Sequence, residues 1–96
     1  MDNWKDALAR SRIPLRMHDG IINWIEHGLP PGHFLTAVFR NDLMEAFSRA
    51  DDENGALLRE YALFLYNYAP AGSYGSEHSV RQWQADKLKA RERAAK

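Results

Sequence analysis

The chain has 96 residues, enough for one domain, and its 13 basic and 13 acidic side chains give a formal net charge of zero. This balance excludes an overall basic nucleic-acid-binding protein, and the absence of cysteine excludes a disulfide scaffold, a thiol nucleophile and a thiolate metal site. No apolar run resembles a signal peptide or is long enough to span a bilayer, so we expect a cytoplasmic protein that does not enter membranes.

The first two predicted helices cover residues 2–10 and 14–27. Asp2 or Asn3 can cap the first helix, because a short polar side chain accepts a hydrogen bond from a free backbone N–H group. The second helix has the clearest end in the chain. Gly28 can adopt the left-handed conformation that terminates a helix, and two prolines follow shortly after it.

A third helix is expected over residues 32–40 and a fourth over residues 42–50, with Asn41 or Asp42 as the cap between them. No residue at that junction strictly breaks a helix, so one bent helix is the alternative. The periodicity of the fourth segment predicts three side chains that face the core: Leu43, Ala46 and Phe47.

The most apolar stretch, residues 56–68, predicts the central helix of the fold. At 100° per residue, one stripe of this helix carries large apolar side chains: Leu57, Tyr61, Phe64, Leu65 and Tyr68. Further apolar residues lie on its other faces, so we expect neighbouring helices to cover it on several sides. Asp51 and Asp52 are expected to cap it, because negative charge is favourable at a helix N-terminus.

Residues 69–75 form the clearest predicted loop, and Ser76 can cap a last helix that docks through Trp83. Beyond Trp83 the sequence favours a helix but has almost no apolar face to bury, so it should fray or project into solvent. These patterns predict an all-α fold, a small single-domain bundle of about five short helices around the central hydrophobic helix. The helical domain is expected over residues 1–83, with residues 84–96 as a basic extension.

No group of residues predicts a catalytic, metal or cofactor site. His27 and His33 flank a turn, but their spacing matches no established ligand pattern. His18 and Asp19 are adjacent on a helix, so their side chains do not face each other. Helix capping explains the acids at residues 51–53, and we therefore expect no enzyme activity, no metal and no cofactor.

Three sets of residues are candidates for binding a partner. The first is an acidic face between residues 41 and 60: Asp42, Glu45, Asp51 and Asp52. The second is Tyr66 and Tyr74, because Tyr66 faces away from the predicted stripe and Tyr74 lies on a loop. The alternative is that the acids are simply solvated and the tyrosines pack within the fold. The third set can bind nucleic-acid phosphates: Lys87, Lys89, Arg91 and Arg93.

Several strings of the sequence resemble a group of small proteins encoded by temperate phages and prophages. The strings are IEHGLPPGHFL, NDL, RADD and FLYNYAP, followed later by VRQW, and the resemblance extends from about Met17 to Trp83. One departure is Tyr74 before Gly75 and Ser76, where the group has tryptophan. The resemblance implies a viral origin and action inside a bacterial host cell, and it implies no catalytic residue.

The leading hypothesis is a non-enzymatic phage or prophage accessory protein that binds a host or phage protein, as a monomer or homodimer. Inhibition of a bacterial defence system, such as CRISPR interference, is one version of this hypothesis. The alternative is a small nucleic-acid-binding regulator that uses the basic C-terminal helix. Truncation after Trp83 separates the two, since only the second requires the extension.

Overall fold

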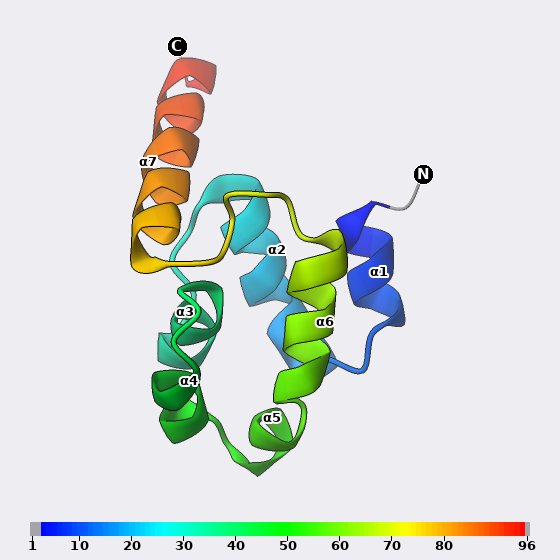
Figure 1. The fold of residues 1–96 in the computed structure, drawn as a ribbon. Helices are drawn as coiled ribbons and strands as arrows, with labels where there is room; N and C mark the ends of the chain where they lie inside the picture. Colours follow the sequence, from blue (N-terminus) through cyan, green and yellow to red (C-terminus); the bar gives the residue numbers. More distant parts are fainter. Residues whose placement is uncertain (1–2, 96) are drawn as a thin grey trace.

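The computed structural model describes residues 3–95, and its regular elements are all helices (Figure 1). They are α1 (Trp4–Arg10), the 3-10 helix η1 (Leu15–Met17), α2 (His18–His27), α3 (His33–Phe39), α4 (Leu43–Arg49), α5 (Asp52–Ala56), α6 (Leu58–Tyr68) and α7 (Glu77–Ala94). The all-α prediction is confirmed. The expected number of about five helices is too low, because the segment after Asp51 forms two helices rather than one.

The helices form a compact body from which α7 extends (Figure 1). Helix α1 packs against α2 and α6, α3 packs against α4, α5 precedes and contacts α6, and the start of α7 packs on α2. The Cα atoms span 43 × 30 × 21 Å. An 18-residue helix is roughly 27 Å long, so α7 accounts for much of the long dimension.

The centre of the core is Trp24 of α2, which is 1% exposed. Its ring contacts Phe39 of α3 at a centroid distance of 5.7 Å. Its indole N–H donates a hydrogen bond to the Ser73 carbonyl at 2.9 Å, and its own carbonyl accepts one from the Trp83 indole N–H at 3.1 Å. These contacts fasten α3, the loop before α7 and α7 itself to α2.

Local capping interactions explain why several helices begin and end where they do. Asn3 caps α1 and Ser76 caps α7, and each side chain accepts a hydrogen bond from the backbone N–H three residues later. Gly28 ends α2 in the predicted left-handed conformation, with φ of 66°. A Cβ atom at Gly28 would lie 2.6 Å from the Cβ of Lys87, so the missing side chain also lets α7 cross α2 closely. The predicted cap at Asp2 lies outside the described residues.

The predicted central helix differs from the structure. Asp51 caps α5, where its carboxylate accepts a hydrogen bond from the Asn54 backbone N–H at 2.8 Å, and Leu57 separates α5 from α6. Helix α6 buries one stripe only: Tyr61, Phe64 and Leu65. Tyr68, which was predicted to belong to that stripe, is 42% exposed. The expectation that neighbours cover this helix on several sides is therefore not confirmed, and α2 supplies the central side chain instead.

The structure also tests the expectations for the junction between α3 and α4, for α7 and for the second predicted helix. Asn41 has φ of 63°, so α3 and α4 are separate helices and the single bent helix is excluded. Helix α7 continues without a break from Glu77 to Ala94, and its second half projects from the body (Figure 1). The second predicted helix is divided, because Leu15–Met17 forms a 3-10 turn before α2 begins at His18.

Candidate functional site

An open apolar groove with a volume of about 320 Å³ lies between α4 and α6. Leu43 of α4 lines one side, Tyr66 of α6 lines the other, and Tyr74 from the loop before α7 contributes a third part of the lining. Three alanines from α3, α4 and α6 also line it: Ala37, Ala46 and Ala62. Their short side chains leave room between the helices, so the groove can receive an apolar group.

Helix α4 carries an apolar arc that its own domain does not cover. At 100° per residue, Ala46, Leu43, Phe47 and Met44 follow one another around an arc of about 160°. Ala46, at one edge of this arc, is buried, whereas Leu43, Phe47 and Met44 are 65%, 64% and 73% exposed. The prediction for Ala46 is confirmed, and the prediction that Leu43 and Phe47 face the core is wrong. Helix α4 packs mainly on α3, and the rest of the arc stays exposed.

We refer to Leu43, Met44, Phe47 and Tyr66 together as the apolar surface. Tyr66 is 82% exposed and shares the groove with Leu43, so the groove joins the α4 and α6 parts of this surface. At roughly 200 Å² for a fully exposed large side chain, the four exposed fractions amount to roughly 550–600 Å². That area is at the upper end of what monomeric proteins expose as one apolar patch, and such patches commonly bind partners.

The structure brings three of the predicted partner-binding residues to this groove. Asp42, Tyr66 and Tyr74 all line it. The Asp42 carboxylate accepts a hydrogen bond from the Glu45 backbone N–H at 3.1 Å and lies 3.5 Å from the Arg40 guanidinium, so it serves as the cap of α4. Tyr74 is half-buried and packs against the core, whereas Tyr66 stands in solvent. Tyr66 is therefore the tyrosine that is free to contact a partner.

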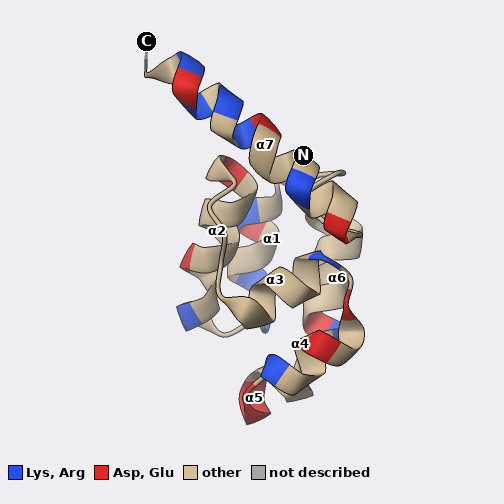
Figure 2. Cartoon of the chain, turned by 90° about the vertical axis from the view of Figure 1, so that its left-hand side faces the viewer, with Lys and Arg blue, Asp and Glu red and all other residues tan. Residues whose placement is uncertain are grey.

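The remaining predicted acids lie apart from the groove. Glu45 pairs with Arg49 at 3.5 Å, on the face of α4 that points away from the apolar arc. Asp51 pairs with Arg16 at 2.9 Å. Asp52 is exposed in the first turn of α5, a helix on which Figure 2 shows acidic residues. The four acids do not gather with the tyrosines on one acidic face, so recognition at the groove would depend on apolar contacts.

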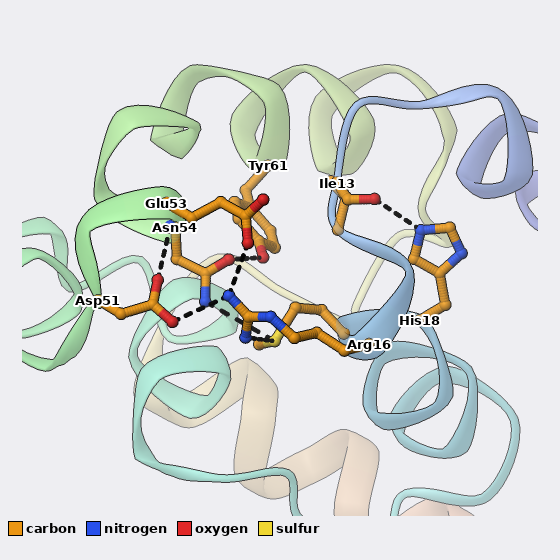
Figure 3. A network of polar contacts seen from close by, with 8 residues as sticks. Ile13, Arg16, His18, Asp51, Glu53, Asn54 and Tyr61 are labelled. Atoms are coloured by element: carbon orange, nitrogen blue, oxygen red, sulfur yellow. Dashed lines mark hydrogen bonds and ion pairs between the residues drawn. The ribbon is translucent and has the colours of Figure 1, made fainter.

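A second cluster of polar residues connects η1 to α5 (Figure 3). The Arg16 guanidinium donates hydrogen bonds to Asp51 at 2.9 Å and to Glu53 at 2.8 Å. The hydrogen bond to Glu53 raises the pKa of Arg16. The pKa of Asp51 is lowered, mainly by the hydrogen bond from the Asn54 backbone N–H and to a smaller extent by Arg16. All these charged groups are exposed to water, which screens their attraction, so the cluster orients α5 more than it stabilises the fold.

Next to this cluster, the Tyr61 hydroxyl donates a hydrogen bond to the Asn54 side-chain oxygen at 2.6 Å (Figure 3). Both residues are buried, and burial raises the pKa of Tyr61 above its ordinary value. The phenol is the hydrogen-bond donor of this pair, because the Asn54 side-chain oxygen can only accept. This arrangement joins α5 to α6 and has a structural role.

The side chains of His18 and Ser73 also have structural roles. His18 donates from Nε2 to the Ile13 carbonyl at 2.8 Å (Figure 3), and the buried Ser73 hydroxyl donates to the Pro70 carbonyl at 2.6 Å. Over residues 3–95, no three histidine or carboxylate side chains come together as a metal site would require. The same residues include no helix that is both long enough and apolar enough to cross a membrane.

Comparisons of this chain with protein-family models, with curated proteins and with solved structures found no match. Its function therefore has to be inferred from its own surface. Of the features described, the apolar surface and its groove are the ones that the fold itself does not use.

Three members of the apolar surface were not identified as site residues from the sequence. The periodicity of α4 predicts a core position for Leu43 and Phe47, and no pattern in the sequence distinguishes Met44. The available signal was the width of the arc, because four of the five residues from Leu43 to Phe47 are apolar on a helix of only seven residues. Such a short helix packs on few neighbours, so part of a wide arc stays exposed.

Proposed function

We propose that this protein is a non-enzymatic interaction protein that binds another protein through the apolar surface and its groove. The observation that carries the proposal is the exposure of Leu43 and Tyr66 in the lining of one open groove, with Phe47 and Met44 exposed beside Leu43 on the same arc of α4. Each partner in a standard protein–protein interface contributes roughly 800 Å². The apolar surface supplies much of that area, and the groove can accept a side chain of the partner.

Aromatic residues are expected to dominate the binding energy. Tyrosine is enriched among the few residues that carry most of the affinity in an interface, and such residues lie near its centre. Tyr66 lines the groove from α6, and Phe47 lies next to the groove residue Leu43 on the exposed arc of α4. Tyr74 is packed into the fold, so its expected role is to shape the groove.

The resemblance to small proteins of temperate phages supports a host or phage protein as the partner, and a phage accessory role as the biological setting. Inhibition of a bacterial defence system, such as CRISPR interference, is one form that this role can take. An apolar groove suits a partner with exposed aliphatic or aromatic side chains, because such contacts need no opposite charge. The protein would then act as a monomer, or as a homodimer if a second copy occupies the surface.

The test is capture of the partner with matched variants. Tagged wild-type protein, Phe47→Asp and Leu15→Asp are each exposed to a bacterial lysate from phage-infected cells. Leu15 is 81% exposed and belongs to η1, outside the apolar surface, so it controls for loss of an exposed leucine. We expect a stoichiometric partner with wild type and with Leu15→Asp, and none with Phe47→Asp. Equal capture by all three proteins would contradict the proposal.

The two tyrosines give a second measurement once the partner is purified. Tyr66→Ala should leave the melting temperature nearly unchanged, because exposed substitutions usually cost less than about 0.5 kcal/mol. It should weaken binding by about 2 kcal/mol or more, roughly thirtyfold in Kd. Tyr74→Ala should instead lower the melting temperature. Light scattering after size-exclusion chromatography measures self-association. A dimer that forms with wild type but not with Phe47→Asp, and that does not bind the partner, would show that a second copy of the chain occupies the apolar surface.

A further inference from the structure

The sequence contains one asparagine that is followed by glycine, Asn54–Gly55, and the proposed function does not use this pair. Asparagine is a thermolabile residue, because the backbone nitrogen of the next residue can attack its side-chain amide carbon. Glycine in the next position obstructs this attack least, since it has no Cβ atom. The other four asparagines are followed by bulkier residues: Trp4, Trp24, Asp42 and Tyr68. Asn54 is therefore the asparagine whose sequence most favours this chemistry.

The reaction is a spontaneous deamidation whose only co-reactant is water. The Gly55 backbone nitrogen forms a bond to the Asn54 Cγ, and the bond from Cγ to Nδ2 breaks. The proton of the Gly55 N–H group leaves with Nδ2 as part of ammonia, and the product is a cyclic imide, a succinimide. Water then opens this ring at either of its two carbonyl carbons, which gives aspartate or isoaspartate at position 54.

The folded structure holds Asn54–Gly55 in a geometry that does not react. Asn54 lies in the middle of α5, where the Gly55 N–H donates to the Asp51 carbonyl at 2.8 Å. The Asn54 side chain is 4% exposed, and its oxygen accepts from the Tyr61 hydroxyl at 2.6 Å (Figure 3). Its Nδ2 lies 3.7 Å from the Met17 sulfur. Ring closure requires Asn54 to leave the helical backbone region and its side chain to turn onto the Gly55 nitrogen, so these contacts have to break first.

Local opening of α5 exposes this pair while the rest of the domain stays folded. Helix α5 has five residues, too few for a helix that is stable by itself. Asn54 is its one buried residue, and the ion pairs from Arg16 to Asp51 and Glu53 are exposed to water. Segments with few buried contacts open at a lower free energy than the whole protein unfolds. We propose that Asn54–Gly55 is a deamidation site that the closed α5 protects and that opening of α5 makes reactive.

Both products of deamidation favour the open state of α5. Isoaspartate continues the chain through its side chain and adds one backbone carbon, which interrupts the helical hydrogen-bond repeat. Aspartate keeps the backbone but places a negative charge at a buried position, beside three acids of the same segment: Asp51, Asp52 and Glu53. The reaction is therefore a one-way release of α5 from α6, and it does not depend on the protein partner proposed above.

The experiment measures deamidation of the full chain during incubation at neutral pH, with and without guanidinium chloride. Trypsin releases Asn54 in the peptide of residues 50–59, which holds no other asparagine, so mass spectrometry of this peptide follows the site by itself. Gly55→Ala tests the chemistry in denaturant. The fold tolerates this change, because the added Cβ atom would meet only the Ala50 side chain, at 3.8 Å.

Three further variants test the role of α5, and circular dichroism shows that each is folded under the conditions used. Tyr61→Phe removes the hydrogen bond to Asn54 and keeps the ring. Gly28→Ala is the control, because it destabilises the protein at the crossing of α7 over α2, outside α5. Arg16→Gln removes the ion pairs to α5 and replaces Tyr61→Phe if that variant does not fold.

In denaturant we expect Asn54 to deamidate before the other asparagines, and Gly55→Ala to slow it roughly tenfold or more. Without denaturant, wild type should react at least roughly tenfold more slowly, because a site that reacts only when open is slowed by the rarity of the open state. Tyr61→Phe should react at least about fivefold faster than folded wild type, which corresponds to about 1 kcal/mol. Gly28→Ala should react at the wild-type rate.

Three results would each overturn the proposal. Equal rates for wild type with and without denaturant would show that the closed α5 does not protect the site. An unchanged rate in Tyr61→Phe would show that the hydrogen bond to Asn54 does not control opening. Equal acceleration by Tyr61→Phe and Gly28→Ala would show that the site reacts through unfolding of the whole domain. None of these measurements involves the apolar surface, so their outcome is independent of the proposed function.

Discussion

Replacement of Tyr61 by phenylalanine isolates one buried hydrogen bond. The Tyr61 hydroxyl donates to the Asn54 side-chain oxygen at 2.6 Å, and the two residues are 2% and 4% exposed. Phenylalanine keeps the ring, which packs edge-on against Phe34 at a centroid distance of 5.2 Å, and removes only the hydroxyl. The Asn54 oxygen then loses the donor that satisfies it, in a place that water reaches poorly.

The cost of leaving a buried acceptor unsatisfied is about 1–3 kcal/mol. In a domain of this size, about 1 kcal/mol shifts the melting temperature by about 4–8 °C, so a cost of about 2 kcal/mol should lower it by about 8–16 °C. Thermal unfolding followed by circular dichroism measures the shift. Tyr66→Phe is the control, because its hydroxyl is in solvent and its loss should have almost no effect. An unchanged melting temperature in Tyr61→Phe would refute the role of this bond in holding α5 to α6.

The same hydroxyl gives a pH dependence of definite sign. Burial raises the pKa of Tyr61 above its ordinary value of 10.0. Above that pH the unfolded chain loses the proton before the folded protein does, so the native state binds more protons and its stability falls as the pH rises. The advantage of wild type over Tyr61→Phe in unfolding free energy should therefore be full at about pH 9 and smaller at about pH 11. An advantage that does not change over this range would contradict the assignment of a buried phenol.

Two further substitutions test the core and the crossing of α7 over α2. Phe64→Ala should cost about 3–5 kcal/mol, since Phe64 is 3% exposed, and a melting temperature within a few degrees of wild type would remove it from the core. Gly28→Ala should cost at least about 1–2 kcal/mol for its left-handed backbone, and it should also shift Trp83 fluorescence by displacing Lys87 and α7. Gly32→Ala is the matched control, because a Cβ atom there meets nothing within 4 Å, and equal effects of the two alanines would contradict the crossing.

The helix ends were the most predictable part of this fold. Asn3, Ser76 and Gly28 act within their own helix termini, through side-chain or backbone hydrogen bonds that span only a few residues. Their effects depend on local geometry, which the sequence specifies directly. The same reasoning identified Asp51 as a cap, but it placed the cap on the wrong helix.

The break between α5 and α6 could not be predicted, because it depends on a contact between two separate elements. Asn54 and Tyr61 are seven residues apart, which in one continuous helix would place them roughly 10.5 Å apart along the axis. Their side chains could not then form a 2.6 Å hydrogen bond. The turn at Leu57 brings them together, and burial of this polar pair against η1 compensates for the lost helical continuity. No local pattern in the sequence predicts that a buried polar pair will replace the helical hydrogen bonds at this point.

The candidate binding surface was predictable on α6 and not on α4. Tyr66 could be assigned from the sequence because at 100° per residue it points away from the apolar stripe of its helix. Leu43 and Phe47 could not, because an apolar stripe predicts that a face will be covered without identifying what covers it. A small domain buries a smaller share of its surface than a large one, so it cannot cover every such stripe from within. The stripe that stays uncovered after folding is the place where a partner gains most by binding. The apolar face of α4 is predicted to be buried and is exposed in the structure. For that reason it indicates a binding function more strongly than the apolar faces that are buried in the core.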